Sequence, residues 1–548
     1  MSSNLPPTGP PTGPGGTPEY LEQGGGAPYT PGPGRTRNLR PVIIGGAVVG
    51  GLAVAGGAAW AAMSFLGTGA QPAEALPAST LGYVSVDLDP NGAQKIEAIR
   101  TLNKFPGFKD ELDLETDDDL RRSLFDEIQG GEGCANLDYA EDIETWLGSR
   151  AALAVVDDTP TVAVVVQVSD AEAAEAGLEK LRNCAAGGDA DVAAPPDGDL
   201  GFEVDGEWAV LAESSEMAAK VLADGAESPL VDDPDFQTWT GRAGDPGIMS
   251  IYAAPDALSA LTRLGEGLGP MAGLDGDTSA ELTPETDPAL FENFEGMAAT
   301  LRFDDGAIEF ETAGGLSGQA TALYASDGGD DVMGTLPADT AAAFGMGFED
   351  GWLTKIVDQM SGYLGEDMTT PDLFEELSDL TGLDVPADVE TLMGDSAVLA
   401  VGGDFDAEQM MSSADGSDVP AGLKVQGDPG AIEAVLDKLR STMGPDATIL
   451  EADADGDVIA IGPNADYRAQ LLDAGTLGES DTFRDVIREA EQAGVVFYLD
   501  FDAGNGWLAT LADDDPEVAA NVEPLSAIGM SAWSEGGVGH GVLRLTTE

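Results

Sequence analysis

The chain has 548 residues with 100 acidic side chains against 24 basic ones, so its formal net charge is −76. A surface this acidic repels nucleic acid and anionic lipid headgroups at long range, and we therefore exclude a nucleic-acid partner. Hydrophobic residues make up 43% of the chain, far too many for a protein that is disordered throughout. The acidity fits either solubility in a salty exterior or the attraction of divalent cations.

The N-terminal part predicts a membrane anchor. Residues 1–40 form a Pro/Gly-rich tail that we expect to be disordered. Residues 41–66 contain the uncharged run Val42–Leu66, which exceeds the roughly 20 apolar residues that a membrane-spanning helix needs. Three arginines precede this run, so the positive-inside rule places the tail in the cytoplasm and everything after residue 66 outside the cell membrane.

Two features of the predicted anchor have alternative interpretations. Ala73–Ala75 resembles the small-residue cleavage site of a signal peptide, although the apolar part of a signal peptide is usually shorter than this run. Gly46 and Gly50 form a GxxxG pair, which allows transmembrane helices to self-associate. A segment this rich in Gly and Ala also produces such pairs by chance. We predict an uncleaved, single-pass anchor, with helix-mediated self-association as an open alternative.

Strand and helix patterns follow a short linker at residues 67–75. In chain order, we expect strands or hairpins at 81–88, 151–156, 161–168, 202–212, 248–253 and 297–312. We expect helices at 91–103, from 116 to 130, up to 181, near 214–224 and near 233–240. The turn dipeptides Asp205-Gly206 and Asp305-Gly306 predict two of the hairpins.

The second half of the chain repeats the first. The repeated segments are Leu76–Thr80 with Leu336–Thr340, Asp142–Val156 with Asp388–Gly402, and Lys180–Arg182 with Lys438–Arg440. Because these matches keep the same order, they indicate a tandem duplication into exterior units at residues 76–330 and 331–548. The predicted fold class is α+β: a single transmembrane helix, then a duplicated exterior domain with mostly antiparallel sheets and packed helices.

Several motifs resemble a known family. They are the Leu-Pro-Ala-Ser-Thr opening at Leu76–Thr80, the strand Gly82–Asp87, the pair Phe105-Pro106 and the turn Trp146–Gly148. These motifs are similar to those of an uncharacterised family of bacterial envelope proteins, domain of unknown function 3352, over roughly residues 76–548. The resemblance implies an anchored protein of unknown activity, and it brings no catalytic residues with it.

The sequence presents no clear catalytic or metal-binding constellation. With one histidine, His540, and two cysteines, the chain cannot assemble a zinc site of the usual Cys/His kinds. Glu451–Asp457 imitates the start of a calcium loop, but Gly462 stands where the bidentate acid is required, and so a plain hairpin turn is expected. We predict no cofactor, no metal and no enzymatic activity.

The two cysteines, Cys134 and Cys184, are predicted to form a disulfide within the first unit. Their counterparts in the second unit are Leu380 and Thr442, so both cysteines are missing there together. Disulfides persist outside the cytoplasm, where this part of the chain is expected. Two independent buried thiols are the alternative.

From these features we predict a non-enzymatic binding or scaffolding module for an unknown envelope component. Two alternatives stay open: a carboxylate-dependent hydrolase that acts on a cell-wall polymer, and a weak binder of divalent cations. A broad apolar groove would favour binding. A cleft with two close carboxylates of raised pKa and exposed aromatic rings would favour the hydrolase.

Overall fold

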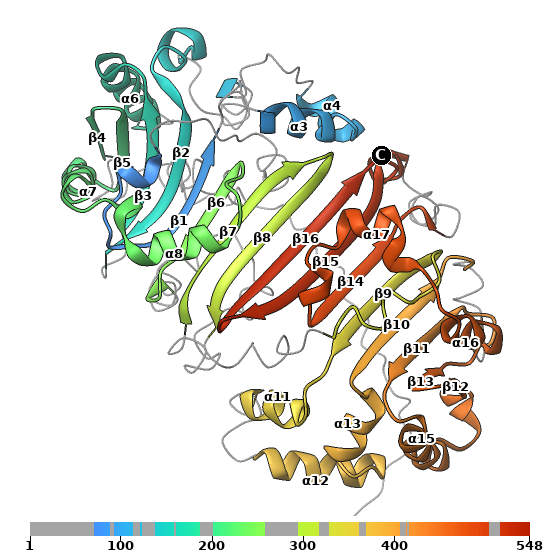
Figure 1. Ribbon diagram of the computed structural model, residues 1–548. Coiled ribbons are helices and arrows are strands. Elements are labelled where there is room, and N and C mark those ends of the chain that lie inside the picture. Colours follow the sequence, from blue (N-terminus) through green and yellow to red (C-terminus); the bar gives the residue numbers. More distant parts are fainter. Residues whose placement is uncertain are drawn as a thin grey trace, which may run out of the picture. The chain divides into compact units, whose positions relative to one another are not determined.

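The structure, a computed structural model, describes residues 71–87, 93–112, 121–122, 137–157, 161–186, 201–257, 294–316, 328–360, 369–405, 413, 416–503 and 516–548. Within these residues, 16 strands form one sheet in which every neighbouring pair is antiparallel (Figure 1).

The strands of the first half are β1 (Thr80–Asp87), β2 (Leu147–Val156), β3 (Thr161–Val168), β4 (Gly201–Asp205), β5 (Trp208–Ala212), β6 (Met249–Ala253), β7 (Phe294–Asp304) and β8 (Ala307–Leu316). Those of the second half are β9 (Thr340–Gly347), β10 (Ser396–Gly402), β11 (Ala421–Gln426), β12 (Ala452–Asp455), β13 (Val458–Ile461), β14 (Val495–Asp500), β15 (Leu525–Glu535) and β16 (Val538–Thr547).

The helices of the first half are α3 (Ala93–Leu102), α4 (Pro106–Leu112), α6 (Ala171–Ala186), α7 (Ser215–Glu227) and α8 (Pro234–Arg242). The second half has α11 (Trp352–Met360), α12 (Thr370–Thr381), α13 (Ala387–Met393), α15 (Pro429–Met443), α16 (Ala465–Leu472), α17 (Asp481–Val486) and α19 (Pro516–Val522). The short helical turns are η2 (Pro72–Glu74), η3 (Tyr139–Ile143), η4 (Leu230–Asp232), η8 (Gly444–Leu450), η9 (Leu477–Glu479) and η10 (Ala490–Gln492).

The two halves contribute their strands in the same order. The first half reads β4-β5-β3-β2-β1-β6-β7-β8 from the outer edge inwards, and the second reads β12-β13-β11-β10-β9-β14-β15-β16. The last strands of the two halves, β8 and β16, pair with each other, from Gly314 opposite Gly539 to Ala307 opposite Thr546. We call this junction the seam.

The repeated Leu-Pro-Ala-x-Thr motif forms the same turn at the start of β1 and β9. Thr80 donates its hydroxyl hydrogen to the carbonyl oxygen of Pro77 at 2.7 Å, and Thr340 does the same to Pro337 at 2.7 Å. The backbone N–H groups of both threonines also donate to these carbonyls. The motif therefore has a structural role, closing the turn from which the first strand of each half begins.

The repeated aspartate and lysine form equivalent ion pairs. Lys180 on α6 binds the carboxylate of Asp142, and Lys438 on α15 binds that of Asp388 at 2.6 Å. The hydrogen bond from Lys180 lowers the pKa of Asp142. Burial opposes the same effect at Asp388, but Lys438 outweighs it, so the pKa of Asp388 is also lowered. Each pair ties a long helix to the segment that leads into the second strand of its half.

The sheet is covered differently at its ends and in its middle. At the ends, helices pack on both faces: α7 and α16 on one face, α6 and α15 on the other. In the middle, α8 and α17 lie on one face only, in front of the strands in Figure 1. We call this side the covered face, and its core includes the buried rings of Tyr83, Tyr252 and Tyr498.

The predicted fold class is wrong in two respects. The strands form one continuous sheet instead of separate sheets, because β8 and β16 pair across the seam. No helix in the described part of the chain is both long and apolar enough to cross a membrane, so the single transmembrane helix is not supported. Residues 1–66, including Val42–Leu66, lie outside the described residues, and the predicted cellular location stays a prediction.

The local expectations for the first half agree with the structure. Each expected strand and helix is present with ends shifted by a few residues, apart from the helix from 116 to 130. Only residues 121–122 of that segment are described. Both turn dipeptides form hairpins, with Gly206 at φ 59° and Gly306 at φ 78°, which is the left-handed region that glycine adopts readily.

Candidate functional site

An unbroken row of large apolar side chains crosses the middle of the sheet. The row follows directly paired positions on β6, β7, β8, β16, β15, β14, β9 and β10. Its members are, in that order, Met249, Leu301, Phe310, Leu543, Met530, Phe497, Phe344 and Leu399. Because successive side chains of a strand alternate between the two faces, all of them lie on the same face, opposite the covered one.

Two parallel rows flank the first one on the same face. One contains Phe303, Ile308, Leu545, Ile528, Leu499, Ala342 and Val401, and the other contains Ile251, Ala299, Thr312, Gly541, Ala532, Val495, Met346 and Ala397. None of the residues in the three rows is charged, and Thr312 has the one polar side chain among them. We call the surface made by these rows the uncharged face.

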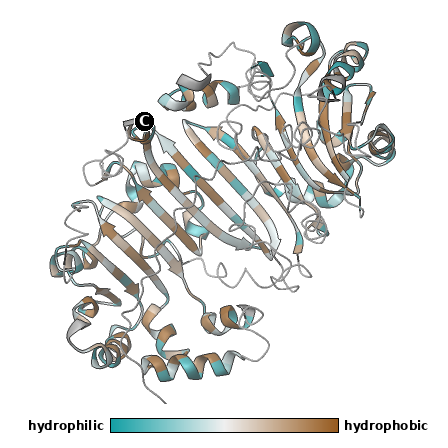
Figure 2. Cartoon of the chain, turned by 180° about the vertical axis from the view of Figure 1, so that it is seen from behind, coloured by the Kyte–Doolittle hydropathy of each residue, from teal (hydrophilic) through white to brown (hydrophobic). Residues whose placement is uncertain are grey.

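The uncharged face is open in its middle. Leu399 is 55% exposed, Phe344 42% and Leu543 38%, and most other members of the central row are half-buried. Figure 2 looks onto this side, where brown segments of neighbouring strands lie next to one another. The face is bordered by α6 at one end and α15 at the other, and α3 covers Phe303 at its edge. Monomeric proteins rarely leave so large an apolar surface in water.

Glycines make a hollow beside the central row at the seam. Gly539 pairs with Gly314, and Gly541 follows on the same face of β16. A Cβ atom added at Gly539 would approach only the carbonyl oxygen of Gly314, at 3.7 Å. Glycine inside a strand weakens the strand, and it often marks a place where another molecule approaches the backbone closely. The pair Gly541–Thr312 separates the Gly539–Gly314 pair from the ridge formed by Leu543 and Phe310.

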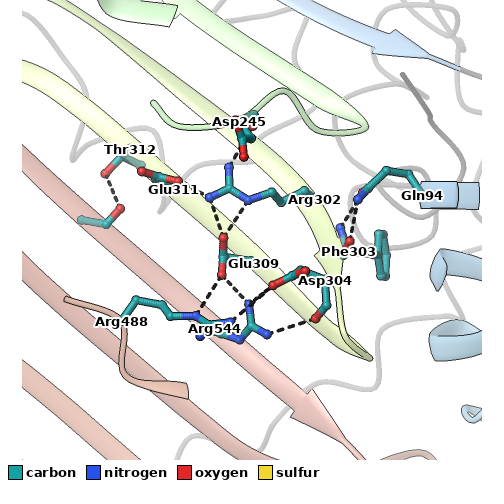
Figure 3. Close-up of polar contacts among 11 residues, drawn as sticks. Gln94, Asp245, Arg302, Phe303, Asp304, Glu309, Glu311, Thr312, Arg488 and Arg544 are labelled. Carbon is teal, nitrogen blue, oxygen red and sulfur yellow. Dashed lines mark hydrogen bonds and ion pairs between the residues drawn. The ribbon is translucent and has the colours of Figure 1, made fainter. Parts of the chain in front are cut away.

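The covered face carries charges at the same junction. Figure 3 shows Glu309 on β8 between Arg302 of β7 and Arg544 of β16. The Nε of Arg302 donates to Glu309 at 2.7 Å, Arg544 donates to the other oxygen of Glu309, and Arg488 lies 3.6 Å from it. The side chains of Glu309 and Arg544 are only 6% and 3% exposed. We call this group the seam cluster; it joins the last strands of the two halves through buried ion pairs.

A cavity of about 610 Å³ lies beside the seam cluster. Its wall includes Arg302, Arg488 and the stacked rings of Trp533 and His540, whose centroids are 5.3 Å apart. Burial lowers the pKa of His540, so this imidazole stays neutral near pH 7. Burial also acts to lower the pKa of Arg302, but the hydrogen bonds and charges of Glu311 and Glu309 outweigh it and raise the value.

The carboxylates beside this cavity are held by an arginine. Glu309 and Glu311 each accept a hydrogen bond from Arg302. Among the carboxyl groups of the described residues, burial raises the pKa of Asp330 to about 6 and also raises that of Asp500, and neither group lines the cavity. Among the described residues, no three His, Cys, Asp or Glu side chains are grouped so that they could hold a metal ion.

The residues singled out from the sequence lie apart from one another. His540 is on β16 beside the cavity, opposite Trp533. Glu451–Asp457 comprises β12 and the turn into β13, and Arg468 binds Asp453 of this strand at 2.8 Å. Cys134 lies outside the described residues, as does the side chain of Cys184, so the disulfide stays a prediction. The sequence interpretation missed the uncharged face, although alternating apolar positions in the two long hairpins signalled it.

Comparison with known proteins identifies a family but no activity. No curated protein matches the sequence. Among solved structures, the one titled "Structure of crystal form III of TP0453" matches with 7% identity over 74% of this chain and 98% of its own, at a TM-score of 0.21. That score is too low to support an argument. The family model described as "Protein of unknown function (DUF3352)" matches residues 42–409, which confirms the family expected from the motifs. The chain belongs to this family.

Proposed function

We propose that the protein is a non-enzymatic binding or scaffolding module that holds another macromolecule on its uncharged face. The observation that carries the proposal is the absence of charge from the three rows of this face, in a chain with a net charge of −76. An antiparallel sheet that faces water normally alternates apolar and polar side chains, with the polar ones outward. The reverse arrangement here favours a face that is covered when the protein works.

The openness of the face favours a large partner. A small ligand needs a pocket that buries about 70–90% of its surface. The two cavities near the seam are lined by other residues, from the covered face and the strand ends. A macromolecule with its own apolar surface fits an open face better, and that partner must lack excess negative charge where it touches. The partner expected from the sequence, another envelope component, stays a prediction.

Site-specific photo-crosslinking in intact cells tests the proposal. The photoreactive amino acid p-benzoylphenylalanine replaces Phe344 or Leu543 on the uncharged face, or Leu380 on α12 as a control. Leu380 is 76% exposed and lies outside the face. We expect an adduct of discrete mass from Phe344 and Leu543 and none from Leu380. Absence of adducts from both face positions, or equal yields from all three positions, would contradict the proposal.

A further inference from the structure

We infer that the partner on the uncharged face is a second copy of this chain, so that two sheets pack face to face. This inference rests on the proposed function. Electrostatics selects the contact face: with 100 acidic residues against 24 basic ones, contact between two copies brings like charges together almost anywhere on their surfaces. The uncharged face is the exception, since its three rows bring no charge at all into the contact.

The size of the face suits a stable dimer. Neighbouring strands are about 4.8 Å apart, so a row across eight strands extends about 34 Å, and three rows with their side chains cover about 20 Å along the strands. As a flat projection this footprint is roughly 700 Å² for each copy, the extent of a standard protein interface, which buries ~800 Å² of accessible surface per partner. Its exposed part lies along the central row, because Phe303, Ala299, Ala532, Val495 and Ala397 of the flanking rows are buried. Homodimer interfaces are also more apolar than other interfaces, as this face is.

The relief of the face is self-complementary. In a two-fold dimer the same patch meets itself, so a protruding part must find a recess on an identical surface. The uncharged face offers both, because β8 and β16 carry the ridge of Leu543 and Phe310 and, beyond the pair Thr312–Gly541, the hollow of Gly539 and Gly314. Packed sheets lie about 10 Å apart with their side chains interdigitating, which is the geometry that such a ridge and hollow allow.

The high net charge makes this association depend on salt. At 0.1 M ionic strength the Debye length is about 10 Å, so two copies with a net charge of −76 repel each other as they approach. At 1 M the Debye length falls to about 3 Å, and the apolar contact then acts with little opposition. The dimer should therefore become stronger with added salt, opposite to an association held by ion pairs.

Sedimentation velocity on the full chain at 0.1 M and 1 M NaCl tests the inference. The wild type is compared with Leu399→Glu and Leu543→Glu on the uncharged face and with Leu380→Glu as the matched control. All three variants replace an exposed leucine and add the same charge. We expect wild type and L380E to dimerise at 1 M, with dissociation constants at least about tenfold lower than at 0.1 M. Both face variants should stay monomeric at the same concentrations and keep the wild-type melting temperature at 0.1 M NaCl and low protein concentration, where dimerisation adds little stability.

The outcomes separate this inference from the proposed function. A wild type that is monomeric at both salt concentrations, or a dimer that survives both face substitutions, overturns the inference. If Phe344 and Leu543 still form adducts with a different protein, the proposed binding function stands without the dimer. If those positions form no adduct either, both ideas fail.

Discussion

The two faces of the sheet differ most where its halves meet. On the covered face, β7, β8 and β16 contribute Arg302, Glu309 and Arg544 to buried ion pairs under a helix layer. On the uncharged face, the positions between these residues are apolar, and Leu543 is exposed to water. A sheet with one wet face normally shows the opposite distribution. The inversion indicates that the folded chain alone leaves the apolar side chains of its uncharged face in contact with water.

The comparison also separates stability from association. Charges on the covered face are paired with partners in the same chain, so their removal should affect folding. The exposed side chains of the uncharged face, Leu399, Phe344 and Leu543, have fewer neighbours in the chain, so their replacement should affect folding little and association strongly.

The largest contrast is expected between two successive residues of β10. Val398 lies on the covered face and is fully buried, whereas Leu399 lies on the uncharged face and is 55% exposed. Val398→Glu should lower the free energy of unfolding by about 4 kcal/mol or more, because it buries an unpaired carboxylate. Leu399→Glu should change it by less than about 1 kcal/mol. Urea unfolding monitored by circular dichroism measures both, and equal losses would show that the two faces are equally buried.

A second contrast concerns the seam cluster. Glu309→Gln removes the carboxylate that Arg302 and Arg544 share. It should cost about 2–3 kcal/mol, because hydrogen bonds to buried charges are lost while Arg302 keeps Glu311 and Arg544 keeps Asp304. The control is Glu433→Gln on α15, whose carboxylate is 45% exposed and binds Arg440. Breaking this exposed pair should cost about 0–1 kcal/mol. The same urea titration gives both values, and a Glu309 variant as stable as the control would mean that the seam cluster does not hold the halves together.

Local chemistry made much of this fold predictable. Asp305-Gly306 predicted its hairpin because Gly306 adopts a left-handed backbone conformation that glycine favours. The repeat of Leu76–Thr80 at Leu336–Thr340 pointed to equivalent turns, and both turns have the same hydrogen bond. Each of these signals acts within a few residues of the chain, which is the range over which sequence patterns are informative.

The seam and the candidate site could not be predicted in the same way. The pairing of β8 with β16 joins residues more than 200 positions apart, and no local pattern specifies such a contact. Alternation in β7 separates Arg302 from Leu301 and Phe303, but it does not tell which side the helices will cover. Because an antiparallel sheet usually turns its charged side chains towards solvent, Arg302 would be expected in water. Instead, α8 and the residues around Arg488 enclose it. Tertiary packing decided which face stays open.

A third prediction concerns Lys424, a buried cation of the covered face on β11. Its ammonium group donates to the hydroxyl and carbonyl oxygens of Thr335, and burial lowers its pKa to about 8. The unfolded chain therefore binds this proton more tightly than the folded one, and stability rises as pH increases from about 8 towards 10.5. Between pH 7.5 and 9.5 the wild type should gain about 2 kcal/mol relative to Lys424→Met. If the urea midpoints of the wild type and of Lys424→Met change with pH in parallel, Lys424 does not titrate with a lowered pKa in the folded protein.

The smallest effect is expected in the glycine hollow of the uncharged face. Gly539→Ala adds a methyl group whose nearest neighbour is the carbonyl oxygen of Gly314 at 3.7 Å, so there is room for it. Alanine restricts the unfolded chain more than glycine does, and the free energy of unfolding should rise by about 0.5 kcal/mol. If the hollow receives the ridge of a second copy, the same methyl group should weaken dimerisation at 1 M NaCl. Urea unfolding at low salt and sedimentation at high salt should therefore change in opposite directions. A loss of stability would show that the hollow is already filled by the chain itself, and unchanged dimerisation would place the contact elsewhere on the face.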